Sequence, residues 1–262
     1  MYIDTHCHLS KEDYSSLDEV VHDAYNANVK KLIISGCDKK SIEESIITAE
    51  KYENVYLALG YHPSEANVIT KQDIERLEDI VKSNKKVIAI GEIGLDYHWE
   101  KDNKETQQSL FRSMIELAKK YSLPVVIHSR DAFQDTYDIL KKSKVKGVIH
   151  CFSGNIENAK MYISLGFKLG IGGVLTFKNS KLKDVLKELE LSNIVTETDS
   201  PYLTPEPYRG KINEPKYVKE IISKISEIKE MDIESVEKII EQNVKDTFGI
   251  WKLTNKYNYA IM

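Results

Sequence analysis

Two histidines near the amino terminus, His6 and His8, stand two positions apart in the run DTHCHL. Side chains along a strand alternate between its two faces, so both imidazoles would project from the same face, roughly 7 Å apart. Rings at that spacing can reach one divalent cation where the strand ends. An isolated H-x-H pair also fits two ordinary surface histidines, so its meaning depends on the other ionisable residues.

Four further ionisable residues each follow a short apolar run: Glu92 after VIAIG, His128 in VVIH, His150 in GVIH and Asp199 in TETDSPYLTP. The two oxygens of the Glu92 carboxylate suit it to bridge two cations. A single buried histidine is usually satisfied by one hydrogen bond, but two at equivalent places on adjacent strands indicate a second pair of ligands. Asp199 can act as a ligand and as a general base.

Glu197 lies two residues before Asp199, on the same face of the expected strand and deeper in the fold. At that position we expect a hydrogen bond to a ligand rather than direct ligation. Carboxylates and imidazoles together suit Zn²⁺, Mn²⁺, Co²⁺, Ni²⁺ or Mg²⁺, and ligand chemistry does not choose among them. These residues therefore predict one or two divalent cations, with Asp199 and Glu92 as the catalytic residues.

The elements that must position these residues are short runs rich in Val, Ile and Leu, which are typical of strands buried on both faces. Eight such runs alternate with longer amphipathic segments that predict helices, and no Pro/Gly/Ser-rich linker divides the chain. We expect the strands at 2–5, 31–35, 55–60, 87–90, 124–128, 147–150, 167–171 and 194–198.

This alternation predicts an α/β fold, a single (β/α)₈ TIM barrel over residues 1–253 with a tail at 254–262. The carboxyl ends of the barrel strands form one mouth, and the candidate ligands lie at those ends. Ser16 and Ser41 each begin an S-x-x-E run that fits a capping box at a helix start. Further helices are expected near 105–121, 215–229 and 232–246.

The composition, 41% apolar and 30% charged over 262 residues, describes a soluble globular protein with a sizeable core. No run approaches the ~18 apolar residues of a membrane helix, and the start MYIDTHCHLS lacks the features of a signal peptide. Three cysteines without a C-x-x-C spacing indicate neither a disulfide framework nor a Cys-type zinc site. We expect a cytoplasmic monomer without a membrane partner. The net charge of −4 offers no basic field to nucleic acid, so such binding would need a local patch or bound cations.

Several motifs together resemble a known family. The runs DTHCHL, GYHP, GEIGLDY, HSRDA, HCFSG, TFKN and ETDSPYLTP, in that order over nearly the whole chain, are similar to those of the TatD family of metal-dependent deoxyribonucleases, within the amidohydrolase superfamily. The combination is highly specific, although no single motif would be.

The resemblance implies two metal sites. In that family the H-x-H pair, the strand-four glutamate and the ETD aspartate hold one cation, here implying His6, His8, Glu92 and Asp199. The same glutamate and the histidines of HSRDA and HCFSG hold the other, which implies Glu92, His128 and His150. The implied function is a deoxyribonuclease of the 3′–5′ exonuclease type that acts on single-stranded or frayed DNA.

Residues on the expected mouth are candidates for contact with a substrate. They are His62, Trp99, Arg130, Lys178, Tyr202, Arg209 and Lys211. The cationic members would stabilise charge that develops on a phosphate, and Trp99 would offer a base a stacking platform. The plain alternatives are solvated lysines, an ion pair between Arg130 and Asp131, and ordinary packing of the aromatic rings.

The leading mechanism is hydrolysis by a water whose pKa is lowered by the cations and whose proton passes to Asp199. A rival uses the same chemistry on an ester or amide, such as a D-aminoacyl-tRNA. A third interpretation is a metal-stabilised binding protein without turnover, against which stands Asp199, since a purely structural site would not need it.

Overall fold

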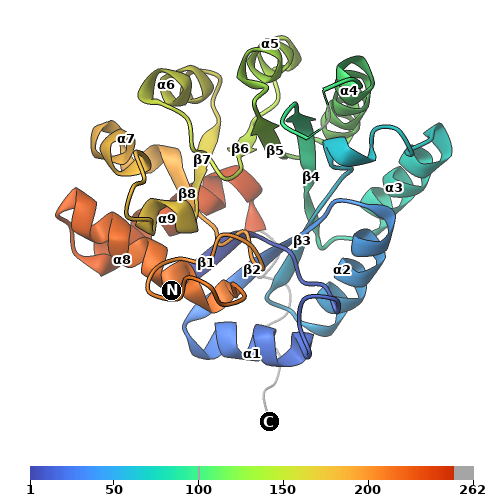
Figure 1. The fold of residues 1–262 in the computed structure, drawn as a ribbon. Coiled ribbons are helices and arrows are strands. Elements are labelled where there is room, and N and C mark those ends of the chain that lie inside the picture. Colours follow the sequence, from blue (N-terminus) through green and yellow to red (C-terminus); the bar gives the residue numbers. More distant parts are fainter. Residues whose placement is uncertain (100, 251–262) are drawn as a thin grey trace.

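Eight parallel strands in the order β1 to β8 form the centre of the computed structural model (Figure 1), which describes residues 1–99 and 101–250. The sheet closes between its last and first strands. There Thr5 Oγ1 donates to the carbonyl of Thr196 at 3.0 Å, and the amide of Asp199 donates to the carbonyl of His6 at 3.0 Å. The strands are β1 Tyr2–Cys7, β2 Val29–Gly36, β3 Val55–Leu59, β4 Val87–Asp96, β5 Val125–Arg130, β6 Gly147–Ile149, β7 Lys168–Ile171 and β8 Ile194–Thr196.

A ring of helices surrounds the strands (Figure 1). The helices are α1 Leu17–Asn26, α2 Lys39–Lys51, α3 Lys71–Ser83, α4 Lys104–Tyr121, α5 Phe133–Ser143, α6 Ile156–Ser164, α7 Leu182–Glu188, α8 Val218–Lys229 and α9 Ile233–Phe248, with 3₁₀ turns at Pro63–Glu65, Gly173–Thr176, Leu191–Asn193 and Pro215–Tyr217. The predicted (β/α)₈ TIM barrel is confirmed. The predicted domain boundary at 253 and the tail at 254–262 lie outside the described residues.

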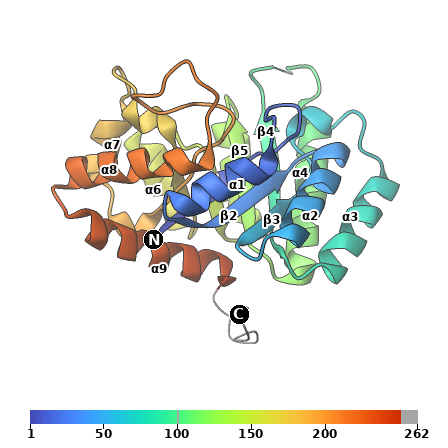
Figure 2. The ribbon, with the colours of Figure 1, turned by 90° about the horizontal axis from the view of Figure 1, so that it is seen from below.

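The amino terminus lies against the outside of the barrel, where the Met1 ammonium contacts Glu237 of α9 at 2.7 Å (Figure 2). In Figure 2 the loop segments 97–99, 101–103 and 197–214 rise on one side of the barrel, and the end of α9 points to the opposite side. The first side carries the carboxyl ends of the strands. Within the described residues, no helix has both the length and the apolar composition needed to cross a bilayer.

Four strands, β1, β2, β4 and β5, continue past the ends that the apolar runs predicted. β4 continues past Ile90 to Asp96 because it keeps pairing with β5, with Ile93 opposite Ile127 and Gly94 opposite His128. All of its residues are buried, so its charged side chains face the interior rather than solvent. Glu92 was predicted at the end of its strand but lies within β4. His6 likewise lies within β1. The length of an apolar run underestimates the length of a strand that also has buried polar residues.

One of the two predicted helix starts is correct and the other is wrong. Ser16 caps α1, since its side chain accepts a hydrogen bond from the amide of Glu19 at 3.2 Å. Asp38, not Ser41, caps α2, because its carboxylate accepts from the amides of Lys40 and Ser41 at 2.8 and 3.0 Å. Ser41 is the third helical residue, and its hydroxyl accepts from the Asp38 amide at 3.0 Å. The capping box thus lies three residues earlier than predicted, formed by Asp38 and Ser41 instead of Ser41 and Glu44.

Gly94 is the residue that allows β4 to approach β5 closely. Its φ is +146°, and a Cβ added there would lie 1.9 Å from the carbonyl oxygen of His128. We expect Gly94→Ala to destabilise the protein by about 3 kcal/mol, measured by urea unfolding, because backbone must move to relieve the clash.

Gly210→Ala is the matched control for Gly94→Ala. Gly210 also has a positive φ, +85°, but a Cβ there would meet nothing within 4 Å. The Gly210→Ala variant should lose about 1 kcal/mol of unfolding free energy, from backbone strain alone. Equal losses in the two variants would show that the contact with His128 does not matter.

Candidate metal centre

Two histidines at the end of β1 and a glutamate of β4 meet inside the mouth of the barrel. His6 lies in β1 and His8 directly after its last residue, and their Nε2 atoms are 3.0 Å apart. Oε2 of Glu92 lies 3.4 Å from Nε2 of His6 and 3.7 Å from Nε2 of His8. The alternation of side chains along β1 therefore aims both rings at one oxygen, as the H-x-H spacing predicted.

Asp199 brings a second carboxylate to the same point from the loop after β8. Its Oδ1 lies 3.7 Å from Nε2 of His6, 3.5 Å from Nε2 of His8 and 3.6 Å from Nε2 of His150. The left-handed backbone of Asp199, with φ +56°, turns the chain at this position. Two imidazoles and two carboxylates converge on one centre, which is a donor set that suits a divalent cation.

The second oxygen of Glu92 faces a different pair of histidines. Oε1 lies 2.8 Å from Nδ1 of His128 and 3.8 Å from Nε2 of His150. One carboxylate thus presents Oε2 to His6 and His8 and Oε1 to His128, within β5, and His150, directly after β6. This is the arrangement that a carboxylate bridging two cations requires.

The charges of the cluster also suit bound cations. Within the part of the chain that the structure describes, the ion pairs formed by Glu92 and Asp199 are with histidines alone. Glu92 is 4% exposed, and two buried carboxylates without a lysine or arginine need positive charge nearby. The residues present therefore fit one or two divalent cations.

The histidines and carboxylates shift one another's pKa values. Burial opposes the charge of Glu92, but His150, His128 and His6 outweigh it and hold the pKa of Glu92 well below its usual range. Burial also opposes charge on His150, yet Glu197, Glu92 and Asp199 raise the pKa of His150 to about 10. The carboxylates are thus ionised at neutral pH and ready to bind cations. A histidine must release its proton before it can do the same.

Glu197 lies beside His150, at the depth that the sequence predicted. It is fully buried, and its Oε1 accepts a hydrogen bond from the amide of Cys151 at 2.6 Å. The same oxygen is 2.9 Å from Nδ1 of His150, and Glu197 acts to raise the pKa of that histidine. Glu197 therefore touches the face of His150 turned away from Glu92, rather than the centre of the cluster.

Asp96 is a member of the cluster that the sequence interpretation missed. It is 5% exposed, and its Oδ2 lies 3.0 Å from Nε2 of His128. Glu92, Gly94 and Asp96 alternate along β4 and so share one face, which is the signal in GEIGLD that would have found it.

His62 and Tyr202, two predicted substrate contacts, lie next to the cluster. Nε2 of His62 is 4.0 Å from Oε1 of Glu92, and the two rings of His62 and His128 are 4.6 Å apart. Burial lowers the pKa of His62 to about 4, although Glu92 opposes the shift. Tyr202 is 59% exposed, with its ring 6.1 Å from that of His8.

The predicted cationic contacts lie outside the cluster, and their side chains differ in the neighbours that they touch. Arg130 is exposed, with its guanidinium 5.3 Å from the centre of the Trp99 ring. Asp131 contacts His98 at 2.9 Å, so the structure does not show the alternative ion pair with Arg130. Trp99 is 74% exposed, which leaves the indole open to a ligand.

Three other cationic candidates come from the loops after β7 and β8. The Arg209 guanidinium lies 4.0 Å from the centre of the Phe177 ring and donates to the carbonyl of Thr204 at 2.8 Å. Arg209 thus braces these loops against each other. Lys178 is exposed beside Phe177, and Lys211 lies 5.6 Å from the centre of the Tyr208 ring.

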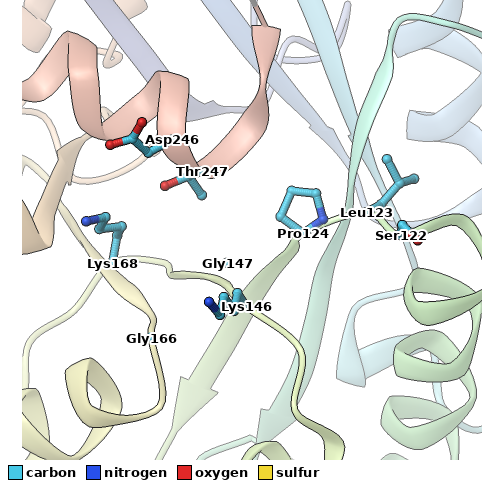
Figure 3. A pocket seen from close by; sticks show the side chains of 9 residues that line it. All are labelled: Ser122, Leu123, Pro124, Lys146, Gly147, Gly166, Lys168, Asp246 and Thr247. Atoms are coloured by element: carbon cyan, nitrogen blue, oxygen red, sulfur yellow. The ribbon is translucent and has the colours of Figure 1, made fainter.

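A separate pocket opens at the other end of the barrel (Figure 3). It has a volume of about 400 Å³ and is lined by the segment before β5, by Lys146 and Lys168 near the starts of β6 and β7, and by Asp246 of α9. None of the candidate ligands lines it. The pocket is therefore distinct from the cluster of histidines and carboxylates.

Comparison with known proteins identifies the family. Residues 3–249 match a family model described as TatD related DNase. The chain belongs to the TatD family. With the family established and the His/Asp/Glu cluster in place, the protein is a metal-dependent hydrolase.

Relatives share both the sequence and the fold of this TatD protein. It is 42% identical over 255 residues to the uncharacterized metal-dependent hydrolase YabD of Bacillus subtilis, covering 95% of this chain and 100% of the relative. The crystal structure of YjjV, a TatD homologue from Escherichia coli, matches with a TM-score of 0.89 and 30% identity over 95% of this chain and 98% of that one. A hydrolase of the TatD family from Entamoeba histolytica matches with a TM-score of 0.85 and 25% identity, covering 94% and 97%.

Proposed function

We propose that the protein is a deoxyribonuclease that removes nucleotides from single-stranded or frayed DNA ends, in the 3′–5′ direction. The observation that supports this function most is that the two carboxylate oxygens of Glu92 face two separate groups of histidines. Two cations held a few ångströms apart are the usual machinery for hydrolysing a phosphodiester. The family description, TatD related DNase, supports DNA as the substrate class.

The side chains divide between two cation sites in this proposal. His6, His8, Glu92 and Asp199 would hold one cation, and Glu92, His128 and His150 would hold the other. Bound cations would act as Lewis acids and lower the pKa of an attacking water. Asp199 would orient that water and accept its proton. Its carboxylate is ionised and free to do so at neutral pH, because neighbouring His150, His8 and His6 overcome the effect of burial and keep the pKa of Asp199 low.

His62 is suited to donate a hydrogen bond to a phosphate oxygen. Its Nδ1 accepts from the amide of Ser64 at 3.1 Å, so a neutral ring carries its proton on Nε2, which faces Glu92 and the cluster. The low pKa of about 4 keeps the ring neutral at pH 7. His62 would thus supply a fixed donor rather than a charge.

The exposed residues around the mouth suit a single strand more than a duplex groove. The open indole of Trp99 would stack with an unpaired base, and Arg130, next to it, would contact the backbone. Lys178 and Tyr202 would contact neighbouring nucleotides. With a net charge of −4, the protein depends on these local groups and on the cations to attract DNA.

Removal of metal should abolish this activity. We expect dialysis against EDTA to lower the rate of cleavage of a single-stranded oligonucleotide by about 1,000-fold, because no other group supplies the Lewis acid. Adding back Mn²⁺, Mg²⁺, Zn²⁺, Co²⁺ or Ni²⁺ one at a time should restore it and rank the metals. Oligonucleotides labelled at the 5′ or the 3′ end would show the direction of attack on a sequencing gel.

A side-by-side assay would separate the rivals. Turnover of D-aminoacyl-tRNA with no cleavage of DNA would replace the deoxyribonuclease with an ester hydrolase. Failure to turn over either substrate, in protein shown by elemental analysis to hold its metal, would favour a binding protein.

A further inference from the structure

Asp96 uses its two carboxylate oxygens for two different contacts. Oδ2 lies 3.0 Å from Nε2 of His128. Oδ1 accepts hydrogen bonds from the amides of His98 at 2.9 Å and Trp99 at 3.2 Å. One buried side chain therefore joins the proposed cation ligand His128 to the loop that carries the exposed Trp99.

The backbone of Asp96 is itself held in place. The Asp96 amide donates to Oε1 of Gln107 at 2.9 Å, and Nε2 of Gln107 donates to the Asp96 carbonyl at 2.9 Å. Gln107 is a buried residue of α4. A side-chain amide thus binds both backbone polar groups of Asp96 and fixes the direction of the Asp96 carboxylate.

We propose that Asp96 is a positioning residue that makes His128 a ligand of the second cation. An ionised carboxylate at Nε2 accepts a hydrogen bond from that nitrogen and so keeps the ring proton there, which leaves the lone pair of Nδ1 free on the side facing Glu92, 2.8 Å away. The inference rests on the proposed function, since it presumes the second cation site. Asp96 would select the tautomer and hold the plane of the ring.

Asparagine has the same shape as aspartate but should not replace it. Oδ1 of Asp96 faces two amide donors, so the side chain introduced by Asp96→Asn would place its only oxygen there and turn its NH₂ group toward His128. That NH₂ would donate to Nε2 and favour a proton on Nδ1, the nitrogen that must bind the cation. Asp96→Asn should therefore impair the second site at least as much as Asp96→Ala.

The test is a calorimetric titration of metal-stripped protein with Zn²⁺. Wild type should bind two cations. Asp96→Asn and Asp96→Ala should bind the second cation between about 10- and 100-fold more weakly, while affinity for the first changes less than about threefold. Because cation affinity is lost and not the chemistry, excess Mn²⁺ should restore most of the activity of Asp96→Ala. Circular dichroism would verify that each variant folds.

Asp131→Asn is the matched control. Asp131 lies on the loop after β5, is mostly exposed and contacts His98 but no proposed ligand. The Asp131→Asn variant should bind both cations with the affinities of wild type. If wild type binds two cations and the Asp96 variants bind them equally well, the positioning role is refuted and the proposed function stands. If wild type binds a single cation, this inference fails together with the two-cation site.

Discussion

Glu92→Gln is expected to lower kcat by about 1,000-fold, which corresponds to about 4 kcal/mol of transition-state stabilisation. The reason is that the two oxygens of Glu92 lie on different sides, 2.8 Å from Nδ1 of His128 and 3.4 Å from Nε2 of His6. Glutamine has one oxygen, and its amide nitrogen has no lone pair to offer a cation. Whichever way the amide turns, one site loses a ligand.

Two measurements check this prediction. Steady-state kinetics on a single-stranded oligonucleotide gives kcat, and elemental analysis of the purified variant should show one cation bound instead of two. Glu75→Gln is a matched control, because Glu75 is an exposed residue of α3 that pairs with Lys71. Two bound cations and activity within tenfold of wild type would rule out a bridging role for Glu92.

Asp199→Asn should reduce kcat by roughly 1,000-fold, with KM changed less than about threefold, because the proton acceptor is removed while substrate contacts remain. Asparagine tolerates the left-handed φ of +56° at this position, so the fold should survive. The first cation should bind more weakly, since Oδ1 lies 3.5 Å from Nε2 of His8 and 3.7 Å from Nε2 of His6.

Excess cation distinguishes the two roles given to Asp199. If Asp199 is the base, saturating Mn²⁺ should refill the site of the Asp199→Asn variant without restoring kcat. Full recovery at high Mn²⁺ would mean that Asp199 serves as a ligand only. Asp184→Asn, an exposed position on α7, controls for the loss of a carboxylate elsewhere in the protein.

Much of the site followed from the sequence because a parallel barrel turns strand position into spatial position. Every strand ends at the same mouth, so His6, Glu92 and His128 could be expected to meet although they are far apart in the chain. Glu197 could likewise be placed on the same face as Asp199, since the side-chain alternation of a strand sets which residues share a face.

Contacts that depend on the loops did not follow from the sequence. Arg209 was a candidate for phosphate binding, but its guanidinium lies on Phe177 and holds two loops together. Asp96 was overlooked because its strand was expected to end at residue 90. That strand, β4, continues because it stays paired with β5 as far as Asp96. A local run of apolar residues does not predict pairing with a distant strand.

The order of buried runs and polar strand ends determined the barrel, the mouth and the residue types gathered there, because these depend on periodicity along one chain. Only the tertiary structure decided that the oxygens of Glu92 face opposite groups of histidines and that Asp96 reaches the far nitrogen of His128. Those details depend on strand register and ring orientation, which are set by neighbouring strands and helices packed against them.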